Sequence, residues 1–117
     1  MKVIFLDIDG VLNDLEYIDA NTEPGMVLSG REKQIDPVRV DRLKRIMKAT
    51  GAKVVYSTSW RLLIDLPIGS LGRPYSIEDL NRAVHLSPED ILGVTPRLDR
   101  KGRGAEIKAW LEEHPEV

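Results

Sequence analysis

Short apolar runs mark where the chain is expected to form strands. Val3 to Ile8 is rich in β-branched and aromatic residues and contains a single polar residue, Asp7. A run of this kind predicts a buried strand, central in a parallel sheet. Lys53 to Tyr56 has the same character, and Ile91 to Val94 is a shorter apolar stretch. We therefore predict three strands, with Asp7 at the carboxyl end of the first.

Apolar residues recur at helical spacing between the first two strands. The residues concerned are Val40, Leu43, Ile46 and Met47. Asp36 before Pro37 is a strong helix start, because aspartate caps free N–H groups and proline suits the first helical position. Gly51 suits the position just past the last turn. The pattern predicts a helix over residues 37 to 50.

Two more helices and two loops are predicted in the rest of the chain. Ser76 is a candidate N-cap for a short helix that ends near residue 84. A last helix from residue 105 would place Ile107, Trp110 and Leu111 on one apolar face. Residues 13–36 and 62–75 are rich in turn formers, which predicts loops. The first of these loops is expected to form a flap over the end of the first strand.

The order strand, helix, strand predicts an α/β fold. Such a unit has a right-handed crossover and a parallel strand pair. The carboxyl ends of both strands then meet at one edge of the sheet, which is where ligands bind in open α/β sheets. Asp7, Asp9 and Ser57 are therefore expected to converge at that edge.

Composition narrows the classes of function. The 117 residues fit a single domain over 1–117. The formal net charge is -2, so any contact with nucleic acid must come from a local patch and not from the overall field. The lack of cysteine excludes a disulfide framework and a thiolate zinc site. Neither a secretory signal nor a membrane span is visible, which favours a cytoplasmic protein without a membrane partner.

Two carboxylates directly after the first strand carry the sharpest chemical signal. Asp7 and Asp9 crowd negative charge at the strand end, and Gly10 begins a turn there. A hard, oxygen-binding cation such as Mg²⁺ would neutralise that charge and still leave positions for phosphate oxygens. The plainer alternative is that the two aspartates only start a turn.

Hydroxyl and cationic side chains supply the other candidates. Ser57 and Thr58 follow the second strand, where a hydroxyl can donate to a phosphoryl oxygen or cap a helix. Arg61 could pair with a phosphate or with a neighbouring carboxylate. Lys101 and Arg103 precede the last helix, where a cation could neutralise a transferring phosphoryl group or simply face solvent.

These motifs resemble those of the haloacid-dehalogenase (HAD) superfamily. Residues 5–13 are similar to its first motif, and residues 54–61 are similar to its second. Residues 93–96 and 103–111 resemble one branch more narrowly, the HAD domain of Swiss Army Knife RNA repair proteins. The resemblance covers nearly the whole chain. It implies a HAD-like Rossmannoid three-layer sandwich with a parallel central sheet, and a small cap or flap at residues 13–36.

The resemblance also implies a phosphatase mechanism. Asp7 would be the nucleophile that forms an aspartyl-phosphate, and Asp9 would be the general acid and base. Mg²⁺ would be held by the Asp7 carboxylate and the Asp9 backbone carbonyl. Ser57 matches the hydroxyl of the second motif, and Arg103 is preferred over Lys101 as the cation beside the phosphate. The predicted substrate-binding residues are Gly10, Thr58, Arg61 and Lys101.

The sequence departs from the superfamily pattern after its last helix. Superfamily members continue into another strand, ending in two or three aspartates that complete the Mg²⁺ site. We expect this C-terminal strand to be missing, which would leave an open sheet edge that a homodimer could cover. A catalytically impaired HAD-fold binding or assembly module is therefore the alternative to an enzyme.

The substrate class stays open at the level of sequence. Free mononucleotides, other phosphorylated small molecules and polynucleotide ends all fit a HAD phosphatase. A small cap would leave the site open, and this favours a bulky substrate such as a nucleic-acid end.

Overall fold

Three parallel strands form the centre of the computed structural model, which describes residues 1–21, 35–58, 77–98 and 101–117. The strands are β1 (Val3–Leu6), β2 (Lys53–Tyr56) and β3 (Ile91–Val94), in the order β1-β2-β3. Both neighbouring pairs are parallel. The three predicted strands and the α/β fold class are thus confirmed.

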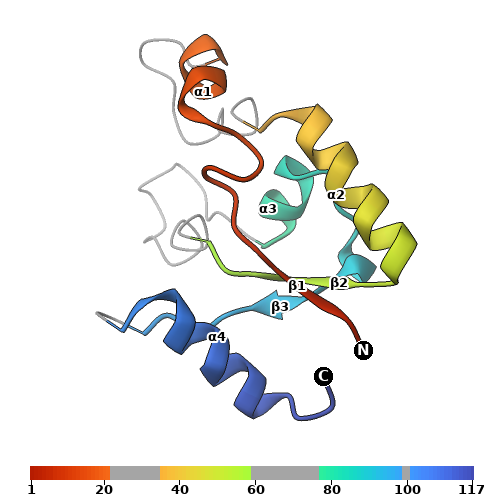
Figure 1. The fold of residues 1–117 in the computed structure, drawn as a ribbon, viewed down its shortest axis with the longest axis vertical. Coiled ribbons are helices and arrows are strands. Elements are labelled where there is room, and N and C mark those ends of the chain that lie inside the picture. Colours follow the sequence, from red (N-terminus) through yellow and green to blue (C-terminus); the bar gives the residue numbers. More distant parts are fainter. Residues whose placement is uncertain (22–34, 59–76, 99–100) are drawn as a thin grey trace.

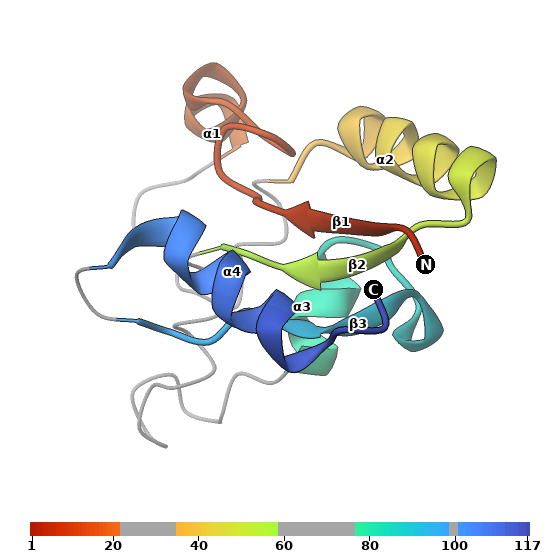
Figure 2. The ribbon, with the colours of Figure 1, turned by 60° about the horizontal axis from the view of Figure 1, so that its bottom comes forward.

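The helices cover both faces of this sheet (Figure 1). Helices α2 (Pro37–Thr50) and α3 (Ile77–Ala83) lie on one face, and α4 (Gly102–Glu113) lies on the other. Figure 2 shows the same three layers with α4 in front of the strands. No helix among the described residues is both long and apolar enough to cross a membrane.

Alternation along the strands divides the apolar side chains between the two faces. Leu6, Val54 and Tyr56 belong to the buried cluster that the sheet shares with α2 and α3. Neighbouring residues along a strand point to opposite faces. Phe5 and Val55, which are paired in register, therefore face α4. Both faces of the sheet are apolar, and this explains why the strands are continuous apolar runs and do not alternate with polar residues.

The predicted caps of α2 are confirmed. Asp36 Oδ1 accepts a hydrogen bond of 2.9 Å from the Val38 N–H. Gly51 ends the helix with φ 72, a left-handed conformation that glycine adopts without steric cost. The expected apolar face is narrower than predicted, because Val40, Leu43 and Met47 are buried whereas Ile46 is 54% exposed.

Helix α1 (Leu15–Asn21) corrects one prediction, since a loop was expected from residue 13 onward. Asp14 Oδ1 accepts a hydrogen bond of 2.8 Å from the Tyr17 N–H, which satisfies a free donor of the first turn. The Tyr17 hydroxyl donates to the Ile35 carbonyl at 3.3 Å and so ties α1 to the start of α2. Residues 22–34 and 62–75, where the rest of the flap and the second loop were predicted, lie outside the described residues.

Trp110 attaches α4 to the sheet. Its ring meets the Phe5 ring edge to face, with the ring centroids 5.6 Å apart. On β3, Gly93 also lies under the indole, where a Cβ would be 3.9 Å from Trp110 Nε1, an ordinary van der Waals contact. The predicted apolar face of α4 is wrong in one respect: Leu111 is 39% exposed, and the buried residues of the helix are Trp110 and Glu106.

Candidate active site

The carboxyl ends of the strands bring Asp7, Ser57 and Thr95 into one row. Leu6 and Tyr56 are paired in register, so the residues that follow them, Asp7 and Ser57, are neighbours across the sheet. The Ser57 N–H donates to the Leu6 carbonyl at 2.8 Å. The Thr95 N–H donates to the Tyr56 carbonyl at 2.9 Å. The structure therefore brings together two residues that are far apart in sequence and were expected to converge.

Asp7 is held on both carboxylate oxygens. Oδ1 accepts from the Ile8 N–H at 2.8 Å, and Oδ2 accepts from Arg103 Nη1 at 2.5 Å. The Asp7 side chain is 23% exposed and that of Arg103 is 48% exposed, so the pair lies at the protein surface. Of the two candidate cations, Arg103 is the one that contacts Asp7; Lys101 lies just before α4 and is exposed.

A tight turn after Asp7 places Asp9 beside Asn13. The Leu12 N–H donates to the Ile8 carbonyl at 2.8 Å, and Gly10 has φ 84, where a side chain would be strained. The Gly10 N–H donates to Asn13 Oδ1 at 3.0 Å, and Asn13 Nδ2 donates to Asp9 Oδ1 at 3.3 Å. One buried amide thus fixes both the turn and the second carboxylate. The predicted contact of Gly10 with substrate stays a prediction.

Ser57 presents a hydroxyl that lacks an internal partner. The residue is 1% exposed, and its Oγ has no hydrogen-bond partner among the described residues. Leaving a buried hydroxyl unpaired costs about 1–3 kcal/mol. A cost of this size at the end of a strand beside Asp7 is typical of a functional position. Thr58 is buried next to it, and Arg61 lies outside the described residues.

Arg39 connects α2 to the loop that follows Asp9. Its Nη1 donates to the Asn13 carbonyl at 2.7 Å, and its Nη2 forms an ion pair with Asp14 Oδ2 at 2.5 Å. Its Nε also lies 3.7 Å from Asp36 Oδ2. The pKa of Asp14 is lowered from its ordinary value, chiefly by the hydrogen bond from the Tyr17 N–H and further by the charge of Arg39.

Three residues that shape this site were missed by the sequence analysis. Asn13 was noted only as part of the first motif, although an amide four residues after Asp9 can reach back to it across a tight turn. Arg39 gave no signal, because its partners in the loop lie 25 and 26 residues away. Thr95 was noted only within residues 93–96, which resemble the family branch. Its hydrogen bond to Tyr56, the residue before Ser57, follows once β3 is paired with β2.

Comparison with known proteins identifies the family. A family model for the HAD domain in Swiss Army Knife RNA repair proteins matches residues 3–117. The chain belongs to this family. Comparison with curated proteins and with solved structures gives no match. The HAD match confirms the resemblance carried by the motifs around Asp7 and Ser57, and it indicates HAD-type phosphatase activity.

The oxygen donors of this HAD site suit a hard divalent cation. Within the described residues, no group of three or more His, Cys, Asp or Glu side chains is placed to hold a metal ion. Mg²⁺ often keeps several waters, however, and takes only one or two carboxylates plus phosphate oxygens of the substrate. The two expected ligands, the Asp7 carboxylate and the Asp9 backbone carbonyl, are oxygen donors of the kind that such a partial shell uses, and their role as ligands stays a prediction.

Proposed function

We propose that this HAD domain is a Mg²⁺-dependent phosphomonoester hydrolase that works through an aspartyl-phosphate on Asp7. The observation that carries the proposal is the arrangement around Asp7. The carboxylate lies at the end of β1 with Arg103 on one oxygen, and the buried hydroxyl of Ser57 follows the neighbouring strand in register. A nucleophile, a cation and an unused donor are the groups that phosphoryl transfer needs.

The first step transfers the phosphoryl group to the protein. A carboxylate oxygen of Asp7 attacks phosphorus in line, and the bond between phosphorus and the leaving oxygen breaks. Asp9 gives its proton to that oxygen, so the product leaves as a neutral alcohol. Asn13 holds Asp9 through the hydrogen bond to Oδ1, which reduces the orientational freedom of the acid.

The second step returns Asp7 to its free form. Asp9, now ionised, takes a proton from water while the water oxygen attacks phosphorus. The bond between phosphorus and the Asp7 oxygen breaks, and inorganic phosphate leaves. Arg103 and Ser57 would donate hydrogen bonds to the phosphoryl oxygens in both steps. Mg²⁺, held by the Asp7 carboxylate and the Asp9 carbonyl, would offset the negative charge of those oxygens.

The substrate is proposed to be a phosphorylated polynucleotide end, with free nucleotides as the smaller alternative. Family membership supports this choice, because the matching family is described from RNA repair proteins. Exposure at the site also supports it. Asp9 is exposed and Val11 beside it is 51% exposed, so a large substrate can approach the carboxylates and contact an apolar side chain.

The test compares the wild-type protein with Asp7→Asn and with Asp41→Asn as a matched control. Asp41 is an exposed carboxylate on α2 that makes no contact with the residues of the candidate site in the described part of the chain. Phosphate release is measured with and without Mg²⁺ on an aryl phosphate and on a 3′-phosphorylated oligonucleotide. We expect release that needs Mg²⁺, disappears in Asp7→Asn and persists in Asp41→Asn.

Other outcomes decide against parts of the proposal. Turnover that survives Asp7→Asn would exclude Asp7 as the nucleophile. Faster release from the aryl phosphate alone, with none from the oligonucleotide, would remove the polynucleotide substrate. Silence with both substrates, together with no Mg²⁺ binding by titration calorimetry, would favour the alternative of a catalytically impaired HAD-fold binding or assembly module.

A further inference from the structure

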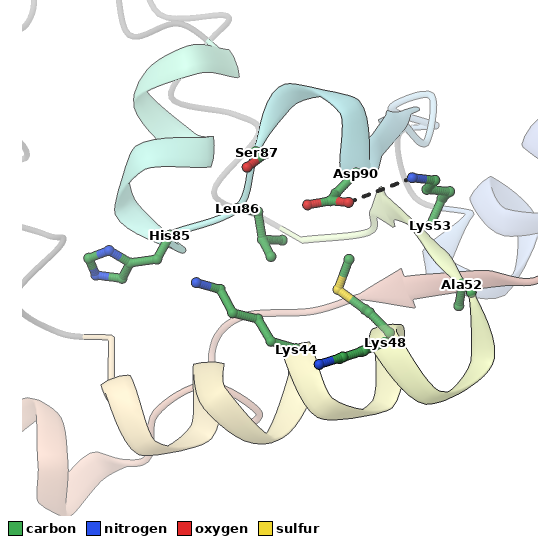
Figure 3. A pocket seen from close by; sticks show the side chains of 10 residues that line it. Lys44, Lys48, Ala52, Lys53, His85, Leu86, Ser87 and Asp90 are labelled. Carbon is green, nitrogen blue, oxygen red and sulfur yellow. Dashed lines mark ion pairs between the residues drawn. The ribbon is translucent and has the colours of Figure 1, made fainter.

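A polar cavity lies at the amino-terminal ends of the strands, opposite the candidate active site (Figure 3). It has a volume of about 280 Å³, is open to solvent and is lined by the end of α2, the start of β2 and the turn that follows α3. Lys53 begins β2 and lines the cavity, and Ser57 follows the end of β2, so the two lie four positions apart along the strand. At ~3.3 Å per residue this is a separation of ~13 Å, too far for the two to form one site.

The lining of the cavity carries an excess of positive charge. Of the described residues, three lysines and one histidine line it, and Asp90 is the one carboxylate among them. Asp90 is already engaged, since its Oδ1 lies 3.6 Å from Lys53 Nζ. Lys44 and Lys48 have no ion-pair partner in the part of the chain that the structure describes. The cavity therefore favours an anion.

The helix dipole explains why a lysine is favourable at only one of these two positions, Lys44 and Lys48. Lys48 lies in the last turn of α2, where a cation interacts favourably with the helix dipole. Lys44 lies one turn earlier and gains much less from the dipole, because the effect falls off beyond the last turn. Figure 3 shows the Lys44 side chain extending from α2 toward the segment that carries His85 and Leu86, and the Lys48 side chain running along the helix.

His85 occupies its place at a conformational cost. Its φ is 58, in the left-handed region, where a residue with a side chain costs about 1–2 kcal/mol relative to the right-handed region. The turn itself is well formed, because the Leu86 N–H donates to the Asn81 carbonyl at 3.0 Å. Glycine would satisfy the same turn without that cost. The left-handed conformation is that of the residue after a helix end, and the exposed His85 side chain lies at the rim of the cationic lining, within reach of a bound anion.

Ser87 adds a hydroxyl that does not cap the helix it precedes. It is the N-cap residue of η3 (Pro88–Asp90), yet its side chain makes no capping hydrogen bond. Met47 and Leu86 give the cavity an apolar floor next to these polar groups. The lining thus combines cations, a hydroxyl donor and an apolar surface.

We propose that this cavity binds a nucleoside monophosphate, independently of Asp7. The phosphate is held by the ammonium groups of Lys44 and Lys48 and by the His85 ring, and the flat face of the base packs on Met47 and Leu86. The site does not depend on the proposed phosphatase activity, because it shares no residue with the candidate active site.

The test follows adenosine 5′-monophosphate binding by two-dimensional NMR and titration calorimetry. All proteins carry Asp7→Asn and are kept free of Mg²⁺, so that turnover does not interfere. We compare K44E/K48E with R42E/R45E, which makes the same change of charge on the same helix at exposed residues outside the cavity. Loss of two charge-assisted contacts should weaken binding by at least about tenfold in K44E/K48E. R42E/R45E should change it by no more than about twofold.

His85→Gly separates a ligand contact from a structural turn. This variant relieves the left-handed strain, so it should be at least as stable to urea as its parent. It should nevertheless bind adenosine 5′-monophosphate more weakly. Unchanged affinity in His85→Gly would overturn the role of the imidazole.

Three further results would overturn the site itself. One is a pattern of NMR shifts confined to residues around Asp7, with none at residues 44–53 and 85–87. Another is an equal loss of affinity in both double variants, which would mean that only the overall field matters. The third is adenosine binding as tightly as adenosine 5′-monophosphate, which would exclude the phosphate contact.

Discussion

Arg103 Nη1 lies 2.5 Å from Asp7 Oδ2, although the two residues are 96 positions apart in sequence. The contact joins the end of the first strand to the first turn of the last helix. Because the Arg103 side chain is 48% exposed, such an ion pair contributes only about 0–1 kcal/mol to stability. In the proposed mechanism, a phosphoryl group bound at Asp7 would therefore take over the guanidinium at little cost. In the free protein, the pair keeps the Arg103 guanidinium beside the proposed nucleophile.

Removing this cation is expected to impair catalysis far more than folding. Arg103→Met should lower kcat/KM by roughly 10²-fold, as loss of one transition-state donor does. The free energy of unfolding should change by less than about 1 kcal/mol. Lys101→Met is the matched control and should lose little activity. A larger loss in Lys101→Met would identify Lys101 as the cation beside the phosphate. Phosphate release and urea unfolding are the two measurements.

Ser57→Ala should separate activity from stability. The alanine removes a buried hydroxyl with no partner among the described residues, so the free energy of unfolding should stay level or rise by about 1 kcal/mol. The rate of phosphate release should fall by roughly 10²-fold, because a donor to the phosphoryl group is lost. A variant that is clearly less stable would mean that the hydroxyl has a structural partner. Urea unfolding and steady-state kinetics on the same preparation decide between the two.

Asn13→Ala should reduce both stability and turnover. Its Oδ1 accepts the Gly10 N–H, so its loss leaves that donor unsatisfied at a cost of about 1–3 kcal/mol. Asp9 also loses the amide that orients it, which should lower kcat more than it raises KM. Asn81→Ala is the control: Asn81 is also buried and accepts from the Tyr56 hydroxyl at 2.7 Å, but its side chain has no hydrogen bond to Asp7, Asp9 or Gly10 in the described part of the chain. It should lose stability while the folded fraction keeps its kcat.

Asp14 should make folding sensitive to acid. Its pKa is lowered from the ordinary value of 3.8, mainly by the Tyr17 N–H and then by Arg39. The ionised form therefore stabilises the fold above 3.8, and this contribution is lost as the pH falls below that value through the lowered pKa. Asp14→Asn should be less stable than the wild type at neutral pH, and the difference should vanish well below 3.8. Urea midpoints across that range test the sign, and a constant difference would contradict it.

Local signals made much of the fold predictable. The strands were predicted because both of their faces are covered, which leaves unbroken apolar runs. Helix α2 was predicted from its ends, since Asp36 and Gly51 make contacts within a few residues of themselves. The convergence of Asp7 with Ser57 followed from parallel pairing alone, because strand ends in a parallel sheet share an edge.

The features that were missed depend on contacts between distant segments. Helix α1 is short, and its capping residue Asp14 is held by Arg39, 25 residues away. Leu111 has the spacing of a core residue, yet α4 is turned so that Glu106 is buried instead; its Oε2 accepts from the Leu98 N–H at 2.9 Å. Ile46 was likewise predicted to lie on the apolar face of α2, but its side chain is exposed. Sequence spacing describes a helix by itself and does not give its rotation against the sheet.

The anchoring of α4 by Trp110 has a consequence for control of the chemistry at a distance. Arg103 and Trp110 are seven residues apart, which is nearly two full turns, so they share one side of the helix about 10 Å from each other. The contact between Phe5 and Trp110 fixes the second half of α4 against the sheet, and Arg103 lies in the first turn of the same helix. Replacing Trp110 by a smaller residue would change the angle between α4 and the sheet and so move the Arg103 guanidinium away from Asp7. Residues that never touch a substrate can thus tune the site through the angle of a single helix.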